Sequence, residues 1–121
     1  MNAPLDPQQL SAMSLDDKYT LTEGHAFMSG VQALVRLPLM QHQRDARLGQ
    51  RTGGFISGYR GSPLGAYDQL LHRAAEHLKA NDISFQPGVN EELAATAVWG
   101  TQQLGFAPPG PQTHDGVFGI W

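Results

Sequence analysis

The sequence predicts an α/β protein in which a parallel sheet is flanked by helices, and two observations support this fold class. Short apolar segments at residues 52–59 and 83–85 alternate with longer segments whose apolar residues recur every three or four positions. Glycine and proline, both above average usage at 14 and 8 residues, separate these segments with turns. Strand, helix, strand, helix at this spacing is typical of βαβ units with parallel strands. The length of 121 residues is that of about one domain.

The first part of the chain divides into an arm and a helix. Residues 1–22 are expected to form an irregular N-terminal arm, because they contain few large apolar side chains to bury. From about Glu23 the apolar residues fall at helical intervals and predict an amphipathic helix. We expect Pro38 to kink or interrupt this helix, since proline lacks an N–H donor and clashes with the preceding turn. A polar helical continuation over residues 41–49 should follow. The inner face of the first helix is predicted to contain Phe27, Val31, Leu34, Val35 and Leu39.

The middle of the chain predicts one strand–helix–strand unit. Residues 52–59 are bounded by glycines and too short for a stable helix, so they predict a buried strand. A turn at residues 59–65 leads into a helix over residues 64–80, and residues 83–85 predict a second strand. The inner face of the helix is predicted to contain Leu64, Tyr67, Leu70, Leu71, Ala74, Ala75 and Leu78.

The last part of the chain predicts a third helix and a further strand. Asn90 is a favourable cap for a helix that contains Glu91 and the small residues after it. Residues 106–114 are too rich in proline for regular structure, and residues 115–121 predict a turn and a strand. Because an apolar segment ending in Trp121 is a poor terminus for a soluble domain, we expect a truncated chain or one piece of a longer protein.

Composition excludes several classes of function. The formal charge is −3 and the arginines are dispersed, so nucleic acid is not an expected partner. There is no cysteine, hence no disulfide, thiolate metal site or iron–sulfur ligand within these residues. The sequence has no secretory pattern and no run of about 18 apolar residues, which predicts a soluble, cytoplasmic protein without a membrane partner.

Two adjacent carboxylates, Glu91 and Glu92, are the first candidates for chemistry. Acids are favoured in the first turn of any helix, where they meet the partial positive charge of its N-terminus. The spacing equally allows an alternative, in which the small apolar residues after them limit the solvation of the two carboxylates. A ligand would then be the partner of these carboxylates. A desolvated carboxyl can keep or share a proton, which suits acid–base work on a heterocycle nitrogen.

The turn after the first strand is the second candidate. One interpretation is an ordinary β-turn with an exposed arginine, since turns of this composition are common. The other is that Arg60, Ser62 and backbone amides of the turn hold the carboxylate of a small substrate. No glycine pattern here is a phosphate-binding P-loop, because no Gly-Lys-Ser/Thr follows. Surface or packing roles are favoured for all five histidines, whose spacing does not form a metal site.

Three longer segments resemble one enzyme family. They are residues 54–65 (GFISGYRGSPLG), 87–100 (PGVNEELAATAVWG) and 115–121 (DGVFGIW). Together they are similar to the N-terminal region of indolepyruvate ferredoxin oxidoreductases of the fused-chain type, over about residues 22–121. The spacing of nine residues from Glu91 to Gly100 also resembles the helix that carries the cofactor-activating glutamate in thiamine-diphosphate enzymes.

The resemblance implies a fold, an activity and roles for residues. It implies that residues 23–121 are the N-terminal, truncated part of a pyrimidine-binding α/β domain that pairs with a diphosphate-binding domain. Such enzymes decarboxylate aryl or branched 2-oxoacids oxidatively to acyl-CoA. The resemblance implies that Glu91 binds the aminopyrimidine nitrogen of thiamine diphosphate and promotes the imino tautomer. Glu92 would then only interact with the partial positive charge at the helix N-terminus. Resemblance to related pyruvate enzymes places Ser62 at the substrate carboxylate, with Arg60 as a helper.

The same resemblance implies cofactors and partners that these residues do not complete. Magnesium and the diphosphate site would lie outside this chain, and iron–sulfur clusters elsewhere in the full-length enzyme. Coenzyme A, the 2-oxoacid and ferredoxin are the expected partners, in a homo-oligomer, and the isolated piece is expected to be inactive. The alternative is a non-catalytic α/β module that uses its proline-rich loop and its apolar end to dock on another subunit of such an enzyme.

Overall fold

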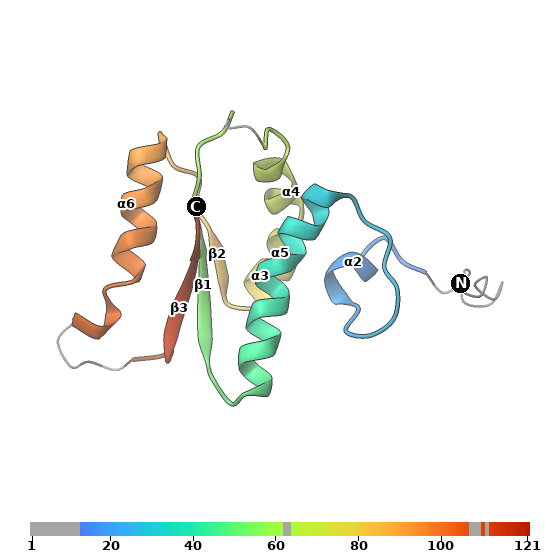
Figure 1. Cartoon of the computed structure of the whole chain (residues 1–121), viewed down its shortest axis with the longest axis horizontal. Coiled ribbons are helices and arrows are strands. Elements are labelled where there is room, and N and C mark those ends of the chain that lie inside the picture. The colour runs from blue at the N-terminus through green and yellow to red at the C-terminus, as the bar shows by residue number, and fades with distance from the viewer. Residues whose placement is uncertain (1–12, 62–63, 107–109, 111) are drawn as a thin grey trace.

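The computed structural model describes residues 13–61, 64–106, 110 and 112–121 (Figure 1). As predicted, it is an α/β structure with a small parallel sheet and flanking helices. In chain order the elements are α2 (Asp17–Thr20), α3 (Gly30–Arg47), β1 (Thr52–Ile56), α4 (Tyr67–Arg73), α5 (Ala75–Ala80), β2 (Ile83–Phe85), α6 (Glu91–Thr101), the 3₁₀ helix η1 (Leu104–Phe106) and β3 (Gly116–Ile120).

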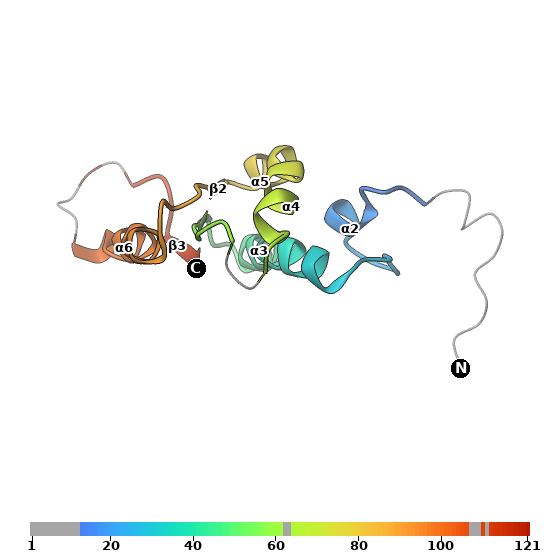
Figure 2. The same ribbon diagram turned by 90° about the horizontal axis from the view of Figure 1, so that it is seen from above.

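The sheet has the strand order β2-β1-β3, and both strand pairs are parallel. Gly54 at the centre of β1 pairs with Ile83 on one side and with Phe118 on the other. Helices α3, α4 and α5 lie on one face of the sheet and α6 lies on the opposite face (Figures 1 and 2). The connections that follow β1 and β2 therefore leave toward opposite faces, which opens a space above the carboxyl ends of these strands, where open α/β sheets bind ligands.

The hydrophobic core lies between the sheet and the three helices on its first face. Apolar side chains from every one of these elements are buried there, because one face of each helix and one face of the sheet must be removed from water. The fully buried members include Val35, Leu39, Ile56, Leu71 and Leu78. On the opposite face α6 buries only Ala94 completely.

Helix α3 differs from its prediction at both its start and its middle. It begins at Gly30 and not near Glu23, because Ser29 and Gln32 form a capping box in which each side chain bonds the other residue's backbone N–H. Phe27 consequently lies before the helix and is 93% exposed. The helix also continues through Pro38, so the predicted interruption is wrong. As predicted, the segment ends at a glycine, Gly49, whose φ of +77° stops the helix.

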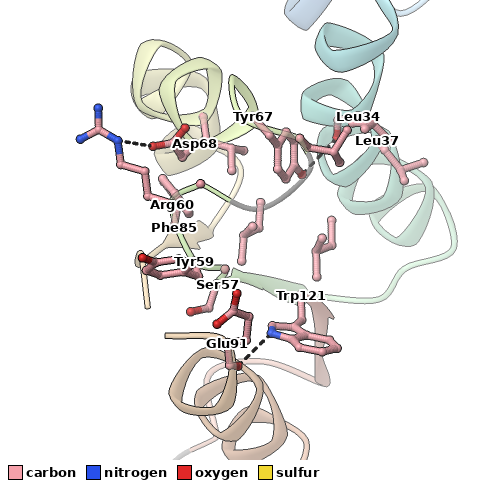
Figure 3. Close-up of a pocket in the computed structure, with 16 residues that line it drawn as sticks. Leu34, Leu37, Ser57, Tyr59, Arg60, Tyr67, Asp68, Phe85, Glu91 and Trp121 are labelled. Atoms are coloured by element: carbon pink, nitrogen blue, oxygen red, sulfur yellow. Dashed lines mark hydrogen bonds and ion pairs between the residues drawn. The ribbon is translucent and has the colours of Figure 1, made fainter. Parts of the chain in front are cut away.

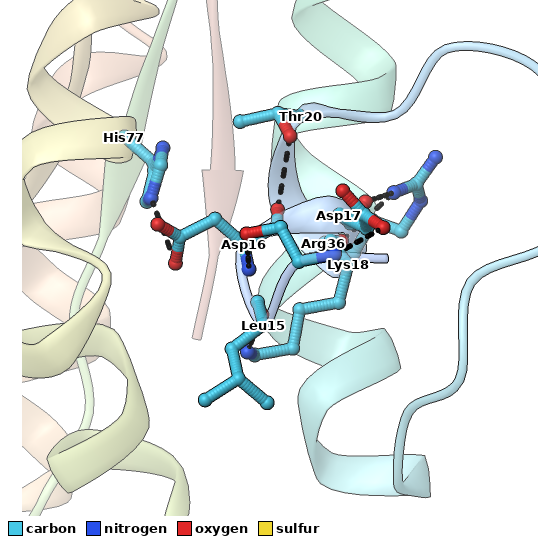
Figure 4. A network of polar contacts seen from close by, with 8 residues as sticks. Leu15, Asp16, Asp17, Lys18, Thr20, Arg36 and His77 are labelled. Carbon is cyan, nitrogen blue, oxygen red and sulfur yellow. Dashed lines mark hydrogen bonds and ion pairs between the residues drawn. The ribbon is translucent and has the colours of Figure 1, made fainter. Parts of the chain in front are cut away.

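The N-terminal arm contains more structure than predicted. Residues 1–12 lie outside the described part, but α2 forms within the arm and buries Tyr19 against the core. The Arg36 guanidinium donates to the backbone carbonyls of Asp17, Lys18 and Leu21 at the end of this short helix (Figure 4). The Asp17 carbonyl also accepts the Leu21 N–H, whereas the last carbonyls of a helix lack intrahelical partners, so a cation from α3 favours this helix end.

The remaining elements follow the sequence pattern with local differences. β1 ends at Ile56, and Tyr59 contributes only an isolated bridge to Gly88. The helix predicted over residues 64–80 is two helices that meet at Ala74. β2 spans the predicted residues, and β3 lies within the predicted 115–121 segment. Part of the predicted proline-rich loop (residues 107–109 and 111) lies outside the described residues.

Candidate functional site

A cavity of about 560 Å³ lies at the carboxyl ends of the strands, a volume within the range of small-molecule sites (Figure 3). Its floor is formed by Ile56, Ser57 and Ile120 at the strand ends. Leucines and aromatic residues from α3, α4 and the loops form most of its walls, so the lining is largely apolar. The walls include Leu34, Tyr59, Tyr67 and Trp121, and the charged lining residues are Arg60, Asp68 and Glu91.

Glu91 lines this cavity as the first residue of α6. Asn90 fixes the start of the helix, because its side-chain oxygen accepts the Leu93 N–H at 2.8 Å. Close packing of Gly88 on Ala94 holds the preceding turn, since a Cβ at Gly88 would lie 2.6 Å from the Ala94 Cβ. The Trp121 indole N–H donates to the Glu91 carbonyl at 3.1 Å and ties the helix start to the end of β3.

The carboxylate of Glu91 points toward Ser57 in the cavity (Figure 3). The residue as a whole is exposed, which contradicts the alternative in which neighbouring small residues limit the solvation of this carboxylate. The physical reason is that the first turn of α6 rises beyond the strand ends, where the cavity is open. Glu92 is also exposed and does not line the cavity, so the two adjacent acids have different surroundings.

Arg60 lies at the rim of the cavity and is paired with a carboxylate. Its Nε is 3.4 Å from Oδ2 of Asp68 in α4, with side-chain exposures of 75% for Arg60 and 20% for Asp68. In Figure 3 the guanidinium points away from Glu91 and the cavity interior. Ser62, the other residue predicted at the substrate carboxylate, lies outside the described residues.

Tyr67 forms the wall between α4 and α3. Its hydroxyl lies 3.5 Å from the Leu34 carbonyl oxygen, a distance longer than the usual O–H···O hydrogen bond and typical of a weak polar contact. Burial raises the pKa of this phenol above its ordinary value of 10.0. The cavity wall therefore keeps a neutral phenol under conditions where an exposed tyrosine begins to ionise.

Sequence reasoning missed three residues of this site. Asp68 was not recognised as a site residue. It lies eight residues after Arg60, on the helix that follows the turn, and this position is compatible with an ion pair between the two side chains. Tyr67 was predicted only as a core residue, and Trp121 only as an apolar end. Their roles depend on contacts between distant segments, and no local pattern marks such contacts.

Two structural features are absent from residues 13–61, 64–106, 110 and 112–121. In these ranges, no group of three or more histidine, aspartate or glutamate side chains lies close enough together to hold a metal ion. None of the described helices is long and apolar enough to cross a membrane.

Comparisons of this chain with protein-family models, with curated proteins and with solved structures found no match.

Proposed function

We propose that this chain is the N-terminal part of a thiamine-diphosphate-dependent 2-oxoacid:ferredoxin oxidoreductase of the indolepyruvate type. In this proposal residues 23–121 begin the pyrimidine-binding domain of the thiamine-diphosphate fold. The observation that carries the proposal is the position of Glu91 at the start of α6, beside an apolar cavity at the carboxyl ends of parallel strands. The three segments that resemble the family all contribute residues to this cavity.

Glu91 has the chemistry that the proposed role needs. Its carboxylate can accept or return a proton at a ring nitrogen of a pyrimidine placed in the cavity, while the apolar walls contact the faces of the ring. The Asn90 cap and the Trp121 hydrogen bond hold the helix start, so the carboxylate is carried on a fixed element. Thiamine diphosphate itself would supply the carbon nucleophile that attacks the 2-oxoacid.

The other parts of the proposed enzyme are assigned outside the described residues. The diphosphate and magnesium ligands belong in this proposal to a diphosphate-binding domain, and the iron–sulfur clusters to further parts of the enzyme. Arg60 would reach a 2-oxoacid carboxylate only after leaving Asp68. The isolated chain is therefore expected to bind the pyrimidine half of the cofactor weakly and to be inactive by itself.

The first test uses the isolated chain and the pyrimidine alone. A titration with 4-amino-5-hydroxymethyl-2-methylpyrimidine, followed by amide NMR shifts, should perturb residues of α6 and the strand ends. Glu91→Gln should weaken binding, whereas Glu92→Gln should not, because only Glu91 lines the cavity. Equal effects of the two variants, or binding outside the cavity, would contradict the assignment.

The second test uses the complete enzyme that contains this chain. Glu91→Gln is expected to lower 2-oxoacid-dependent, coenzyme A-dependent dye reduction at least about 100-fold, the usual minimum for loss of a positioned proton donor or acceptor. Unchanged turnover with normal assembly would refute the catalytic role of Glu91.

A non-catalytic docking module is the second candidate, and one observation favours it. Helix α6 and the residues after it expose large apolar side chains, with Leu93 at 54%, Trp99 at 65% and Phe106 at 86%. An exposed apolar patch of this kind is typical of a surface that another protein covers. The Glu91→Gln variant separates the candidates, because a module would assemble and support turnover without this carboxylate.

A further inference from the structure

Ser57 is a buried polar residue at the floor of the cavity. It follows the last residue of β1 and is only 3% exposed, in a lining that is largely apolar. Its backbone N–H donates to the Ile120 carbonyl at 3.0 Å, which fixes the residue at the junction of β1 and β3. A hydroxyl removed from water is unfavourable unless it gains a hydrogen bond, so the partner of this side chain needs an explanation.

The Ser57 hydroxyl has no hydrogen-bond partner within the part of the chain that the structure describes. In that part, the buried polar side-chain atom that is fully enclosed without a partner is His114 Nε2, which does not line the cavity. The Ser57 oxygen is therefore not sealed inside the protein and reaches the space of the cavity that it lines. Its partner has to come from the contents of the cavity.

Glu91 faces the same space from another element. The start of α6 is held beside the end of β1, because the Gly88 N–H donates to the Gly58 carbonyl at 2.9 Å. Figure 3 shows the Glu91 carboxylate directed toward Ser57. Among the described residues, neither side chain has a hydrogen-bond or ion-pair partner, and both line the cavity. A hydroxyl and a carboxylate thus remain for the inner edge of a ligand.

These two groups suit different protonation states of one ligand atom. An ionised carboxylate only accepts hydrogen bonds, whereas a hydroxyl both donates and accepts. A neutral ring nitrogen also only accepts, so it gains nothing from an ionised Glu91 but can accept the Ser57 O–H. Once the same nitrogen has taken up a proton from water it becomes a donor, and Glu91 can accept its N–H. Arg60 does not serve this edge, since it pairs with Asp68 at the rim.

We propose that Ser57 is a further ligand-binding residue, whose hydroxyl donates to the neutral ring nitrogen of a heteroaromatic ligand in the cavity. Ser57 then holds the unprotonated ring and Glu91 the protonated one. The ligand class is a flat, basic nitrogen heterocycle that enters with its nitrogen toward the strand ends and its faces against the apolar walls. The inference rests on the proposed function for the role of Glu91. It does not involve the turn at residues 59–65, which that function gives to the 2-oxoacid.

The experiment compares three ring probes of similar size on the whole chain by NMR titration at neutral pH. Toluene has no nitrogen, 4-methylpyridine is mainly uncharged and 4-aminopyridine is protonated. Ser57→Ala should weaken binding of 4-methylpyridine by about three- to tenfold, the effect of one lost hydrogen bond. The affinities for toluene and 4-aminopyridine should change by less than about twofold, because neither probe accepts a hydrogen bond from the hydroxyl.

A matched variant and an orientation measurement complete the experiment. Ser84→Ala removes the same hydroxyl from an exposed position of β2 outside the cavity, and should leave all three affinities unchanged. In the wild type, the ring protons beside the nitrogen of 4-methylpyridine should give nuclear Overhauser effects to the Ser57 β-protons. This measurement needs no variant, so it tests the proposal even if Ser57→Ala lowers stability.

Four results would overturn the proposal. They are absence of 4-methylpyridine binding in the cavity, an unchanged affinity for it in Ser57→Ala, an equal loss for toluene, and Overhauser effects from its methyl group to Ser57 instead of from the ring protons. An equal loss for toluene would show a merely structural role. Failure of the Glu91 assignment is distinguishable, because Glu91→Gln would then leave 4-aminopyridine binding unchanged while the Ser57→Ala effect on 4-methylpyridine persists.

Discussion

The Tyr67 hydroxyl lies 3.5 Å from the oxygen of the Leu34 carbonyl, which is the carbonyl that Pro38 leaves without a helical partner. In a regular helix this oxygen would accept the N–H of residue 38, and proline has none. A side chain of α4 thus contacts the gap that Pro38 leaves in the hydrogen bonding of α3. Because the same phenol forms a wall of the cavity, Tyr67 contributes both to the continuity of α3 and to the shape of the site.

The first prediction concerns the pH dependence of stability through Tyr67. Burial raises its pKa above 10.0 in the folded protein, so unfolding releases a proton once the pH exceeds the unfolded value. Its contribution is fully present below about pH 10 and is lost as the pH rises through the folded pKa. Tyr67→Phe should make the free energy of unfolding fall less steeply with pH, as measured by urea denaturation at a series of alkaline pH values.

Part of this alkaline dependence should remain in Tyr67→Phe. Burial, and secondarily the charge of Asp16, also raises the pKa of Tyr19. The double variant with Tyr19→Phe should therefore lose more of the slope. Identical slopes in wild type and Tyr67→Phe would count against a buried, neutral Tyr67.

A second prediction tests the packing at the centre of the sheet. A Cβ added at Gly54 would lie 2.7 Å from the Phe118 ring and 2.9 Å from Ile83 Cγ1, so the Phe118 and Ile83 side chains on both neighbouring strands would have to shift. Gly54→Ala should lower the free energy of unfolding by about 1–3 kcal/mol, the usual effect of overpacking.

The adjacent glycine provides the control for this substitution. At Gly53 the nearest atom to an added Cβ is 3.4 Å away on the His114 ring, an ordinary contact. Gly53→Ala should therefore cost much less, as compared by urea denaturation of the two variants. A similar loss at both positions would point to backbone preference and not to contacts with Phe118 and Ile83.

A third prediction concerns the buried carboxylate of Asp45. Its two oxygens accept the Gln41 side-chain amide at 2.8 Å and the Thr52 hydroxyl at 2.7 Å, which joins α3 to the start of β1. Asp45→Ala should cost about 1–3 kcal/mol because it leaves both donors without their acceptor. Asp45→Asn keeps one acceptor oxygen and should cost less in the same denaturation experiment; the reverse order would contradict the assigned bonds.

A fourth prediction concerns the attachment of the N-terminal segment. Arg36 donates to three carbonyls around the end of α2, and a lysine cannot reproduce this planar arrangement of donors. Arg36→Lys should speed hydrogen exchange at the amides of Tyr19 and Thr20, while exchange in the sheet changes little. Arg47→Lys on exposed α3 surface is the matched control, and equal effects of the two substitutions would refute the role of Arg36.

Local sequence patterns were sufficient to predict much of the fold. The alternation of short apolar segments with helical periodicity located all three strands, and the Asn90 cap located the start of α6 at Glu91. These features follow from interactions between residues close in the chain, namely side-chain caps and the burial of one face of an element. The start of α3 at Gly30 was missed, because the apolar pattern begins earlier in the chain, at about Glu23. The Ser29–Gln32 capping box starts the helix later than this pattern predicts.

By itself the sequence determined the fold class, the sheet segments and the position of Glu91 at a helix start, because short-range periodicity and capping decide these. Only the tertiary structure decided that Pro38 stays within a helix, that Asp68 holds Arg60 and that Trp121 bonds the Glu91 carbonyl. The last contact joins residues 30 positions apart. Such pairs form only when the sheet brings the ends of different elements together, so no local pattern of residues predicts them.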